Sequence, residues 1–167
     1  ILPYRIPFNR PCLTGDEQVY MAQAIASGQL AGDGHFTRKC RDLLEANLGV
    51  ERVLLTTSCT HALEMAALLL NIRPGDEVIV PGYTCVVVFN ALAFAGVTPV
   101  YADIELETYG LDVTRLDRSL TPRTRAIVIH HLYGLVCRDY LATIEYARSR
   151  GLFVIEDCAQ ATGATLD

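Results

Sequence analysis

Residues 152–157 read LFVIED, an apolar run that ends in two carboxylates. The run follows DYLATIEYARSRG, residues 139–151, which reads as a helix that ends at a glycine. A helix that leads into a short, nearly continuous apolar strand is typical of a parallel sheet with both faces covered by helices. The stretch therefore predicts an α/β fold and places Asp157 at the carboxyl end of a strand.

The same alternation extends along the chain on both sides of this stretch. A helix is expected over residues 14–28, with Thr14 as N-cap and Glu17 completing a capping box, and a second from about Phe36 to Leu48, ended by Gly49. The five expected strands are RVLLTTS (52–58), EVIVP (77–81), TPVYAD (98–103), RAIVIHH (125–131) and LFVIED (152–157). The helices expected between them are THALEMAALLLN (60–71), VVVFNALAFAG (86–96), a segment near VTRLDRSL (113–120) and residues 139–151. We therefore expect a three-layer α/β sandwich with a mainly parallel sheet.

Composition restricts the class of protein. A chain of 167 residues with 51% hydrophobic and 20% charged side chains has the size and composition of one globular domain with a core. A net charge of −5 without long charge runs argues against a nucleic acid or an anionic membrane as partner. No apolar run reaches the roughly 20 residues that cross a bilayer, and ILPYRIPFNRP (1–11) lacks the order of a signal peptide. We expect a soluble, cytoplasmic protein.

Cysteines and histidines do not form a metal-binding pattern in the sequence. The six cysteines are widely separated and include no C-x-x-C pair, so they read as scattered thiols. His130 and His131 are adjacent on an expected strand, where successive side chains point to opposite faces. We therefore expect no metal site.

Candidate site residues follow the strands, because ligands of such sheets bind outside the carboxyl ends of the strands. Ser58 and Thr60 put hydroxyls beside the N–H groups at a helix start, an arrangement that suits a phosphate. For a lone motif, a simple N-cap is the more common role of either residue. Tyr83 and Cys85 follow the second expected strand, in what could also be a plain turn.

His131 and Tyr133 follow the fourth expected strand and could face the same crevice or serve only in packing. Alternation puts Glu156 and Asp157 on opposite faces of the last strand, so they do not share one acid–base site. Asp157 could hold a ribose hydroxyl, a metal or a protonated ring nitrogen. No dinucleotide fingerprint and no nearby metal ligands accompany it. The remaining choice, a protonated pyridine, implies pyridoxal phosphate, whose ring needs such a carboxylate to remain an electron sink.

The segments SCTHALEMAALLLNIRPGDEVIVPGYTCVVVFNALAFAG (58–96) and VIEDCAQATGA (154–164) resemble the sugar aminotransferases of the DegT/DnrJ/EryC1/StrS family. Two further segments, IPFNRP (6–11) and SGQLAGDGHFTRKC (27–40), are similar to its branch that makes dTDP-4-amino-4,6-dideoxygalactose. The resemblance covers almost the whole chain. It implies the large domain of a fold-type I pyridoxal-phosphate enzyme.

The resemblance also implies roles for individual residues. Ser58, Cys59 and Thr60 would bind the cofactor phosphate, Asp157 the pyridine nitrogen, and Gln160 the side of the ring that carries the phenolic oxygen. Cys85 stands where the family has the aromatic residue that stacks on the ring, and Tyr83 is a partial substitute. The implied reaction moves an amino group from glutamate to a dTDP-4-keto-6-deoxysugar, in a homodimer.

Lysine marks the main departure from the family pattern. The family's Schiff-base lysine follows the segment that matches VIEDCAQ, and the only lysine here is Lys39, on an expected N-terminal helix. We therefore expect residues 1–167 to be the cofactor-binding part of the enzyme, without the catalytic lysine or the C-terminal small domain. The alternatives are a non-catalytic module that binds pyridoxal phosphate or a nucleotide sugar, part of a dehydratase that uses pyridoxamine phosphate, or a plain nucleotide-binding domain.

Overall fold

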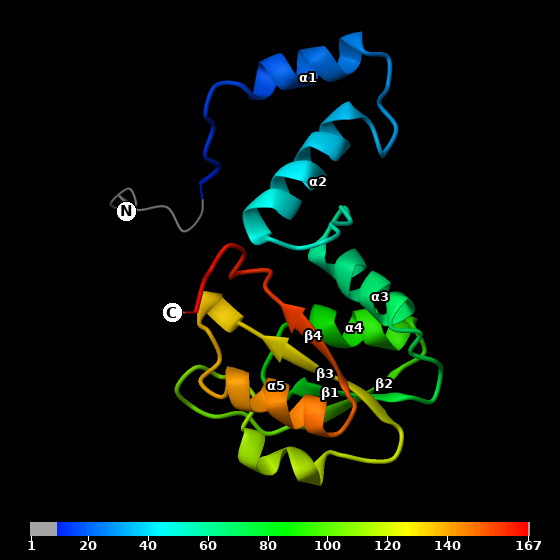
Figure 1. Ribbon diagram of the computed structural model, residues 1–167, viewed down its shortest axis with the longest axis vertical. Helices are drawn as coiled ribbons and strands as arrows, with labels where there is room; N and C mark the ends of the chain where they lie inside the picture. Colours follow the sequence, from blue (N-terminus) through cyan, green and yellow to red (C-terminus); the bar gives the residue numbers. More distant parts are fainter. Residues whose placement is uncertain (1–9, 167) are drawn as a thin grey trace, which may run out of the picture. The chain divides into compact units, whose positions relative to one another are not determined.

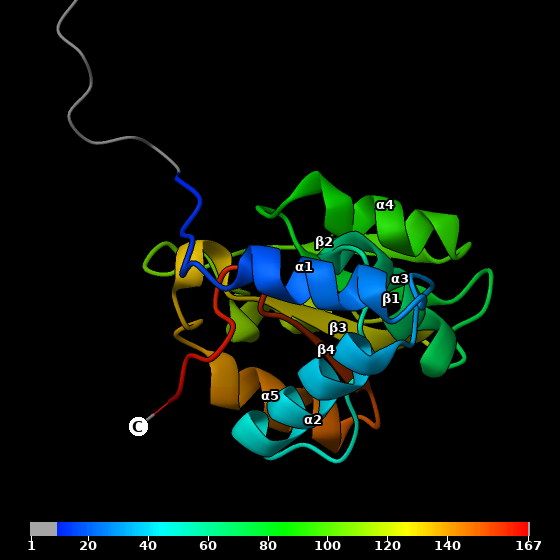
Figure 2. The ribbon, with the colours of Figure 1, turned by 90° about the horizontal axis from the view of Figure 1, so that it is seen from above.

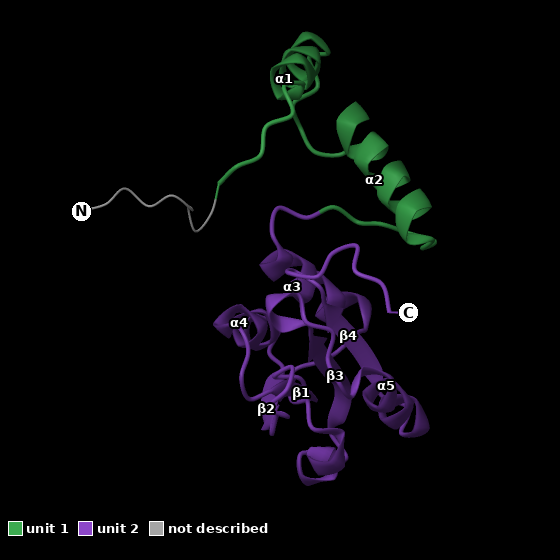
Figure 3. Cartoon of the chain, turned by 90° about the vertical axis from the view of Figure 1, so that its left-hand side faces the viewer, with its two compact units in different colours: residues 1–55 green, residues 56–167 purple. Residues whose placement is uncertain are grey.

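The computed structural model describes residues 10–166. The chain divides into two compact units, one within residues 1–55 and one within residues 56–167 (Figure 3). Residues 1–9, which carry most of the segment used to argue against a signal peptide, lie outside the described residues. Among the helices of residues 10–166, none combines the length and the apolar character needed to cross a membrane.

The first unit contains two helices, α1 (Glu17–Ala26) and α2 (His35–Leu48). Thr14 was expected to cap α1, but the helix begins three residues later, with Asp16 at the N-cap. The Glu17 carboxylate still reaches back, and its Oε1 accepts the Thr14 backbone N–H at 2.7 Å. The contact of Glu17 in the predicted capping box therefore forms, although Thr14 lies two residues before the N-cap. Helix α2 ends as predicted, at Gly49, whose φ of 64° suits a residue without a side chain.

The second unit is built around a parallel sheet (Figure 1). The strands are β1 (Glu77–Pro81), β2 (Thr98–Ala102), β3 (Thr124–His130) and β4 (Phe153–Asp157), in the spatial order β2-β1-β3-β4. All three strand pairs are parallel, so the carboxyl ends of the strands share one edge. The parallel sheet is confirmed.

Helices cover both faces of this sheet (Figure 2). Helices α3 (Cys59–Leu69) and α4 (Val86–Phe94) pack on one face, whereas α5 (Tyr140–Ser149) and the 3-10 helix η1 (Val113–Arg118) pack on the other. A short 3-10 turn, η2 (Leu132–Gly134), follows β3. The three-layer α/β sandwich is thus confirmed.

Two of the expected elements differ in the structure. Residues 52–58 were expected to be a strand, but they form none, and the described sheet has four strands rather than five. The apolar run alone is not enough, because a strand also requires a neighbour that pairs with its N–H and C=O groups. The helix expected near residues 113–120 is the shorter, tighter η1.

The core is divided by the alternation of the strands. Val78 and Val80 face α3 and α4, whereas Ile79, between them, faces η1 and α5. Ile155 lies in the first of these clusters, and Val154 packs against the second. The two faces of β4 therefore carry different neighbours, as the sequence predicts for Glu156 and Asp157.

Strand order creates the position for a site. From β1 the chain crosses through α4 to β2 at one edge, and from β3 it crosses through α5 to β4 at the other edge. The crossovers run on opposite faces, so the loops after β1 and β3 separate. Sheets of this kind bind ligands at such a point.

Replacing Ile79 by Ala tests the core. Ile79 is fully buried between β2, β3 and η1, so Ile79→Ala should lower the free energy of unfolding by about 2–5 kcal/mol. The matched control is Leu68→Ala on α3, whose side chain is 72% exposed and should cost little. Urea unfolding followed by circular dichroism measures both, and equal losses would contradict the assigned core.

Candidate functional site

A cavity of about 230 Å³ opens at the carboxyl edge of the sheet. It is formed by the start of α3, the loop after β1, the end of β3 and the loop after β4. Its lining residues are Cys59, Thr60, Leu63, Cys85, Val87, His130, Leu132, Asp157, Ala159 and Gln160. Five of the residues that the sequence assigned to a cofactor therefore lie around one space, namely Cys59, Thr60, Cys85, Asp157 and Gln160.

Two other hollows, of about 330 and 570 Å³, lie near the amino ends of β3 and β4. Arg125 and Phe153 border both of them. Ligands of parallel α/β sheets bind at the opposite edge, so size alone does not make these hollows the better site. The smaller cavity has the convergent polar groups that mark a binding site.

Asp157 is the buried acid of the cavity, with 4% of its side chain exposed. Its Oδ1 accepts the Ala159 backbone N–H at 3.0 Å and faces the Cys59 thiol at 3.6 Å. Its Oδ2 accepts no hydrogen bond from the described residues, and its nearest basic neighbour is His130 Nε2, 4.0 Å away. One carboxylate oxygen is thus committed to the protein, and the other is left for a donor in the cavity.

His130 stands beside Asp157 because the two residues are partners in the register of β3 and β4. Its Nδ1 lies 2.5 Å from the Thr84 hydroxyl oxygen. Burial lowers the pKa of His130, although the Asp157 carboxylate opposes this effect. The ring is therefore neutral, and we assign Nδ1 as the acceptor from Thr84 and Nε2 as the nitrogen that carries the proton. The Nε2 atom of His130 lies 4.0 Å from Asp157 Oδ2.

The thiol of Cys59 contacts the Asp157 carboxylate. Burial raises the pKa of its thiol, and the charge of Asp157 and the contact with it raise the pKa further. The thiol therefore stays protonated and acts as a weak donor to Asp157 rather than as a nucleophile.

The start of α3 provides two unpaired backbone donors. Ser58 is the N-cap, and its hydroxyl accepts the His61 N–H at 3.2 Å. The N–H groups of Cys59 and Thr60 find no acceptor in the described part of the chain, and the Thr60 side chain lines the cavity. These donors, at the positive end of the helix dipole, suit an anion. The N-cap role that the sequence left open for Ser58 is observed, next to the two unpaired N–H groups.

Tyr83 and Tyr133 lie together beside the cavity. Their hydroxyl oxygens are 3.0 Å apart, and the Tyr133 backbone N–H donates to Gln160 Oε1 at 2.6 Å. Gln160 therefore lines the cavity and also accepts a hydrogen bond from the loop after β3. The structure brings these two tyrosines close to the cofactor candidates.

The structure does not bring His131 to this group. Its ring points to the other face of the sheet, where Nε2 lies 2.8 Å from Glu156 Oε1 and Nδ1 accepts the Cys137 backbone N–H at 3.2 Å. Strand alternation, which separates it from His130, is the physical reason. Of the two roles considered for His131, the position in the crevice is thus corrected, and the ring packs and bonds on the other face.

Potential metal ligands do occur together on that face. One ligand atom each of His131, Glu156 and Cys158 lies within 4.8 Å of the others. The bond from Cys137 makes Nδ1 an acceptor, so Nε2 carries the proton and donates it to Glu156. Burial, followed by the charge of Glu156, raises the pKa of Cys158 to about 11. These contacts make the cluster a hydrogen-bonded network, in which Glu156 joins His131 to Cys158.

Sequence reasoning missed His130 and Thr84. The available signal was the alternation of RAIVIHH, in which His130 shares a face with Val128 and therefore with the core beneath α3 and α4. The Thr84 contact spans 46 residues and has no signal in the local sequence.

The contact between Cys59 and Asp157 can be tested by alkylation. In Asp157→Asn the negative charge is gone, so the pKa of Cys59 should fall and its reaction with iodoacetamide at mildly alkaline pH should become severalfold faster. Mass spectrometry of peptides gives the rate for each cysteine. Exposed Cys40, in the other unit, is the internal control, and an unchanged ratio of Cys59 to Cys40 rates would contradict the contact.

Comparisons with known proteins agree with this geometry. Residues 11–167 match the DegT/DnrJ/EryC1/StrS aminotransferase family. GDP-perosamine synthase of Escherichia coli O157:H7 is 38% identical over 159 residues, which cover 95% of this chain and 43% of that protein. The chain thus spans less than half the length of this relative.

Solved structures show the same fold. An aminotransferase from Psychrobacter cryohalolentis superposes with a TM-score of 0.87 at 32% identity, over 95% of this chain and 40% of that one. The NtdA protein of Bacillus subtilis, solved with bound cofactor PMP, gives a TM-score of 0.84 at 30% identity, over 89% and 34% of the two chains. The sheet is therefore that of the fold-type I pyridoxal-phosphate enzymes. Because the family model matches residues 11–167 of this 167-residue chain, the chain belongs to the DegT/DnrJ/EryC1/StrS aminotransferase family.

Proposed function

We propose that residues 56–167 hold the pyridoxal cofactor of an enzyme that transfers an amino group from glutamate to the keto group of a nucleotide-linked sugar. The observation that carries this proposal is the pairing of two features across one cavity. One is the unbonded Oδ2 of buried Asp157, and the other is the pair of unbonded N–H groups at the start of α3. A carboxylate opposite an anion cradle matches a ligand with a basic ring nitrogen at one end and a phosphate at the other.

Asp157 would bind the ring nitrogen of the cofactor. A buried carboxylate with no cation among its contacts is costly unless it gains a proton donor. A pyridinium N–H supplies that donor and is in turn kept protonated by the negative charge. When bound, the cofactor supplies the electron sink for moving the amino group. The contribution of Asp157 is to hold the proton on the ring nitrogen.

His130 and Cys59 would keep Asp157 in place for this role. The Cys59 thiol and the Ala159 N–H engage Oδ1, which turns Oδ2 toward the cavity. Neutral His130, fixed by Thr84, adds no positive charge that would compete with the pyridinium. The carboxylate thus stays ionised and directed at the ligand.

The phosphate would lie at the start of α3. The N–H groups of Cys59 and Thr60 and the Thr60 hydroxyl are available donors, whereas the Ser58 hydroxyl already caps the helix. Gln160 would bind the side of the ring that carries the phenolic oxygen. Cys85 borders the cavity where the resemblance implies a stacked aromatic ring. A thiol covers less of a ring face than an aromatic side chain does, so stacking here would be weaker.

The sugar would approach from the side of Tyr83 and Tyr133. We propose a 4-keto-6-deoxyhexose as its sugar part, as the sequence resemblance implies. The matched relative from Escherichia coli O157:H7 is named for a GDP-linked product, so the nucleotide part is proposed only as a nucleoside diphosphate. We also expect the whole enzyme to be a homodimer.

Lys39 has no part in this proposal. It lies on α2, in the first unit, where its Nζ is 5.7 Å from the centre of the Phe36 ring. The resemblance places the Schiff-base lysine after the segment that contains Asp157 and Gln160, which is not the position of Lys39. Pyridoxamine phosphate, which needs no lysine to bind, is therefore the suitable probe for this chain.

Replacing Asp157 by Asn tests the assignment of the ring nitrogen. Loss of a charge-assisted hydrogen bond should weaken the binding of pyridoxamine phosphate about 10- to 100-fold, as measured by calorimetric titration. The matched control is Glu156→Gln, one residue away on the opposite face of β4, which should leave the affinity unchanged. Equal effects of the two substitutions would refute the assignment.

Titration with pyridoxal phosphate, with and without borohydride, tests the role of lysine. We expect a saturable absorbance change and no adduct that borohydride can fix, because no lysine faces the cavity in the part of the chain that the structure describes. Mass spectrometry locates any adduct. A reduced adduct on Lys39 would overturn the mapping, and absence of binding would remove the cofactor role.

A further inference from the structure

Three exposed tyrosines from three separate loops lie together at the carboxyl edge of the sheet. Tyr83 follows β1, Tyr109 lies between β2 and η1, and Tyr133 lies in η2 after β3. The ring centres of Tyr83 and Tyr109 are 5.4 Å apart, and those of Tyr109 and Tyr133 are 6.4 Å apart. With the contact between the Tyr83 and Tyr133 hydroxyls, the three side chains form one continuous surface, here called the tyrosine platform.

The fold holds two members of the platform in an unfavourable backbone conformation. Tyr109 has a φ of 61° and Tyr133 a φ of 60°, in the left-handed region that side chains of this size rarely adopt. Both side chains nevertheless stay accessible to a ligand, since 38% of Tyr109 and 60% of Tyr133 remain exposed. Backbone strain at accessible side chains is often found at binding sites.

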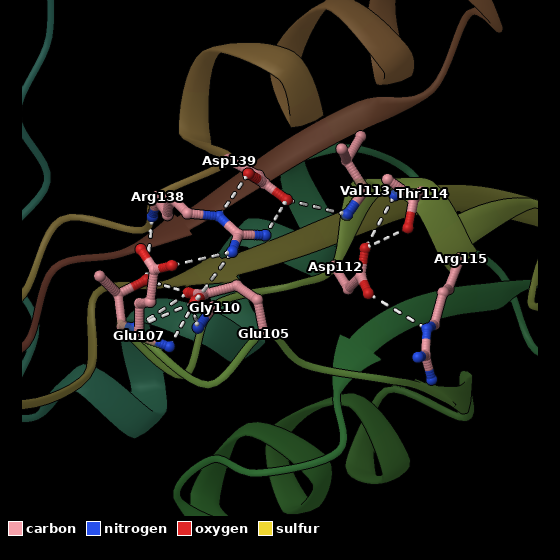
Figure 4. Close-up of polar contacts among 10 residues, drawn as sticks. Glu105, Glu107, Gly110, Asp112, Val113, Thr114, Arg115, Arg138 and Asp139 are labelled. Atoms are coloured by element: carbon pink, nitrogen blue, oxygen red, sulfur yellow. Dashed lines mark hydrogen bonds and ion pairs between the residues drawn. The ribbon is translucent and has the colours of Figure 1, made fainter.

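The loop that carries Tyr109 also contains a buried carboxylate, Glu105, whose polar contacts are drawn in Figure 4. The two Glu105 oxygens accept the backbone N–H groups of Glu107, Thr108 and Gly110, at 2.6 to 3.1 Å, and the Thr108 hydroxyl. These donors lie on both sides of Tyr109 in the sequence, so the loop wraps around the carboxylate and projects the tyrosine outward. Burial alone would raise the pKa of Glu105, but these hydrogen bonds outweigh it and the pKa is lowered.

Arg138 ties the loop to the segment after β3. Its guanidinium bonds to Asp139 and lies 3.9 Å from Glu105 and 3.5 Å from Glu107, as Figure 4 shows. Its backbone N–H donates to the Thr108 hydroxyl at 2.9 Å. The segment that carries Tyr133 and the loop that carries Tyr109 are therefore held to each other.

The platform adjoins the cavity of Asp157. The Tyr133 N–H donates to Gln160, which lines the cavity, and Gly134 packs against the Gln160 carbonyl so closely that a Cβ there would be 3.0 Å from its oxygen. The cavity is also lined by Leu132, which precedes Tyr133, and by Cys85, two residues after Tyr83. A ligand part on the platform would therefore be next to the ring of a cofactor held by Asp157.

The chemistry of the platform indicates an uncharged ligand with hydroxyl groups. The hydrogen bond to Tyr83 raises the pKa of Tyr133, so the Tyr133 phenol remains neutral. Phenols offer an apolar ring face together with a hydroxyl that donates and accepts. A pyranose needs both, because its C–H groups form an apolar face and its hydroxyls form hydrogen bonds. A phosphate needs cations or N–H donors, which the platform does not offer.

We infer that the tyrosine platform binds the hexose ring of the nucleotide-sugar substrate, with Tyr109 as a specificity-determining residue and Glu105 as its positioning residue. The inference rests on the proposed function for the identity of the substrate. It adds that the hexose ring is the part of the substrate recognised here, and that Tyr109, which the sequence did not indicate, takes part. It also gives a reason for the strained backbone of Tyr109 and Tyr133.

Substitution of Tyr109 by Gly separates a binding role from a structural one. Gly adopts a positive φ readily, so Tyr109→Gly should leave the melting temperature unchanged or higher. With pyridoxamine phosphate present, saturation-transfer NMR should show the mannose protons of GDP-mannose in contact with the protein. In Tyr109→Gly this signal should fall, with affinity for GDP-mannose about 3- to 10-fold weaker and affinity for GDP unchanged. Tyr101→Ala, an exposed tyrosine on β2 that packs on Phe89, is the control and should change neither.

The outcomes distinguish the inference from the proposed function. Failure to bind pyridoxamine phosphate would count against the proposed function. Normal binding of this cofactor with GDP and GDP-mannose equally weakened would place the base on the platform and overturn the inference. The inference is also refuted if GDP-mannose does not bind, or if Tyr109→Gly changes only the oligomeric state measured by ultracentrifugation, since the platform would then contact a second copy.

Glu105→Gln tests the positioning role without removing a ring. The amide would turn N–H groups toward the backbone N–H groups of the loop, so Tyr109 should lose its fixed position. Binding of GDP-mannose should weaken to the level of Tyr109→Gly, while the affinity for pyridoxamine phosphate stays the same. Loss of both affinities together would indicate a general structural role, and loss of neither would show that Glu105 does not position the ring.

Discussion

Pairing of β3 with β4 is the constraint on which the site depends. In this register His130 lies beside Asp157, and alternation then turns both side chains toward the face covered by α3 and α4. There the carboxylate meets the start of α3, 98 residues away from it in the sequence at Cys59. A shift of one residue would turn Asp157 away from the cavity and put the longer side chain of Glu156 in its place. The register is fixed by the core, because Ile155 and Val154 pack on opposite faces.

The two carboxylates of β4 show how one strand serves two environments. Asp157 keeps an oxygen unbonded toward a cavity, whereas Glu156 is engaged by His131 and by the Tyr140 hydroxyl on the side of α5. The first arrangement is open to a ligand, and the second ties the sheet to its covering helix. A further carboxylate, Glu105, accepts hydrogen bonds from its own loop and fixes the backbone conformation of that loop. The face of the sheet on which each carboxylate lies and the donors around it, rather than residue type, separate these roles.

Sequence patterns predicted much of this architecture because most of its rules are local. EVIVP and LFVIED read as buried strands, and Gly49 as a helix end, from neighbours alone. Residues 52–58 look equally strand-like, yet strand formation depends on a partner, which no local pattern reveals. The exits of the strands predicted Thr60, Cys85 and Asp157, and the family resemblance added Cys59 and Gln160. The choice of His131 over His130 ignored the face on which Asp157 lies. Tyr109 could not be found, since its place is set by the Glu105 loop and by contacts with two distant loops.

The central claim is that Asp157 keeps a ring nitrogen protonated. Nitrogen NMR of pyridoxamine phosphate labelled with ¹⁵N in its ring, bound to this chain, measures that proton directly. The account predicts the chemical shift of a protonated pyridine at a pH above the pKa of the free cofactor's ring nitrogen, and the shift of a neutral pyridine in Asp157→Asn. A neutral pyridine in the unmodified chain at that pH would contradict the account.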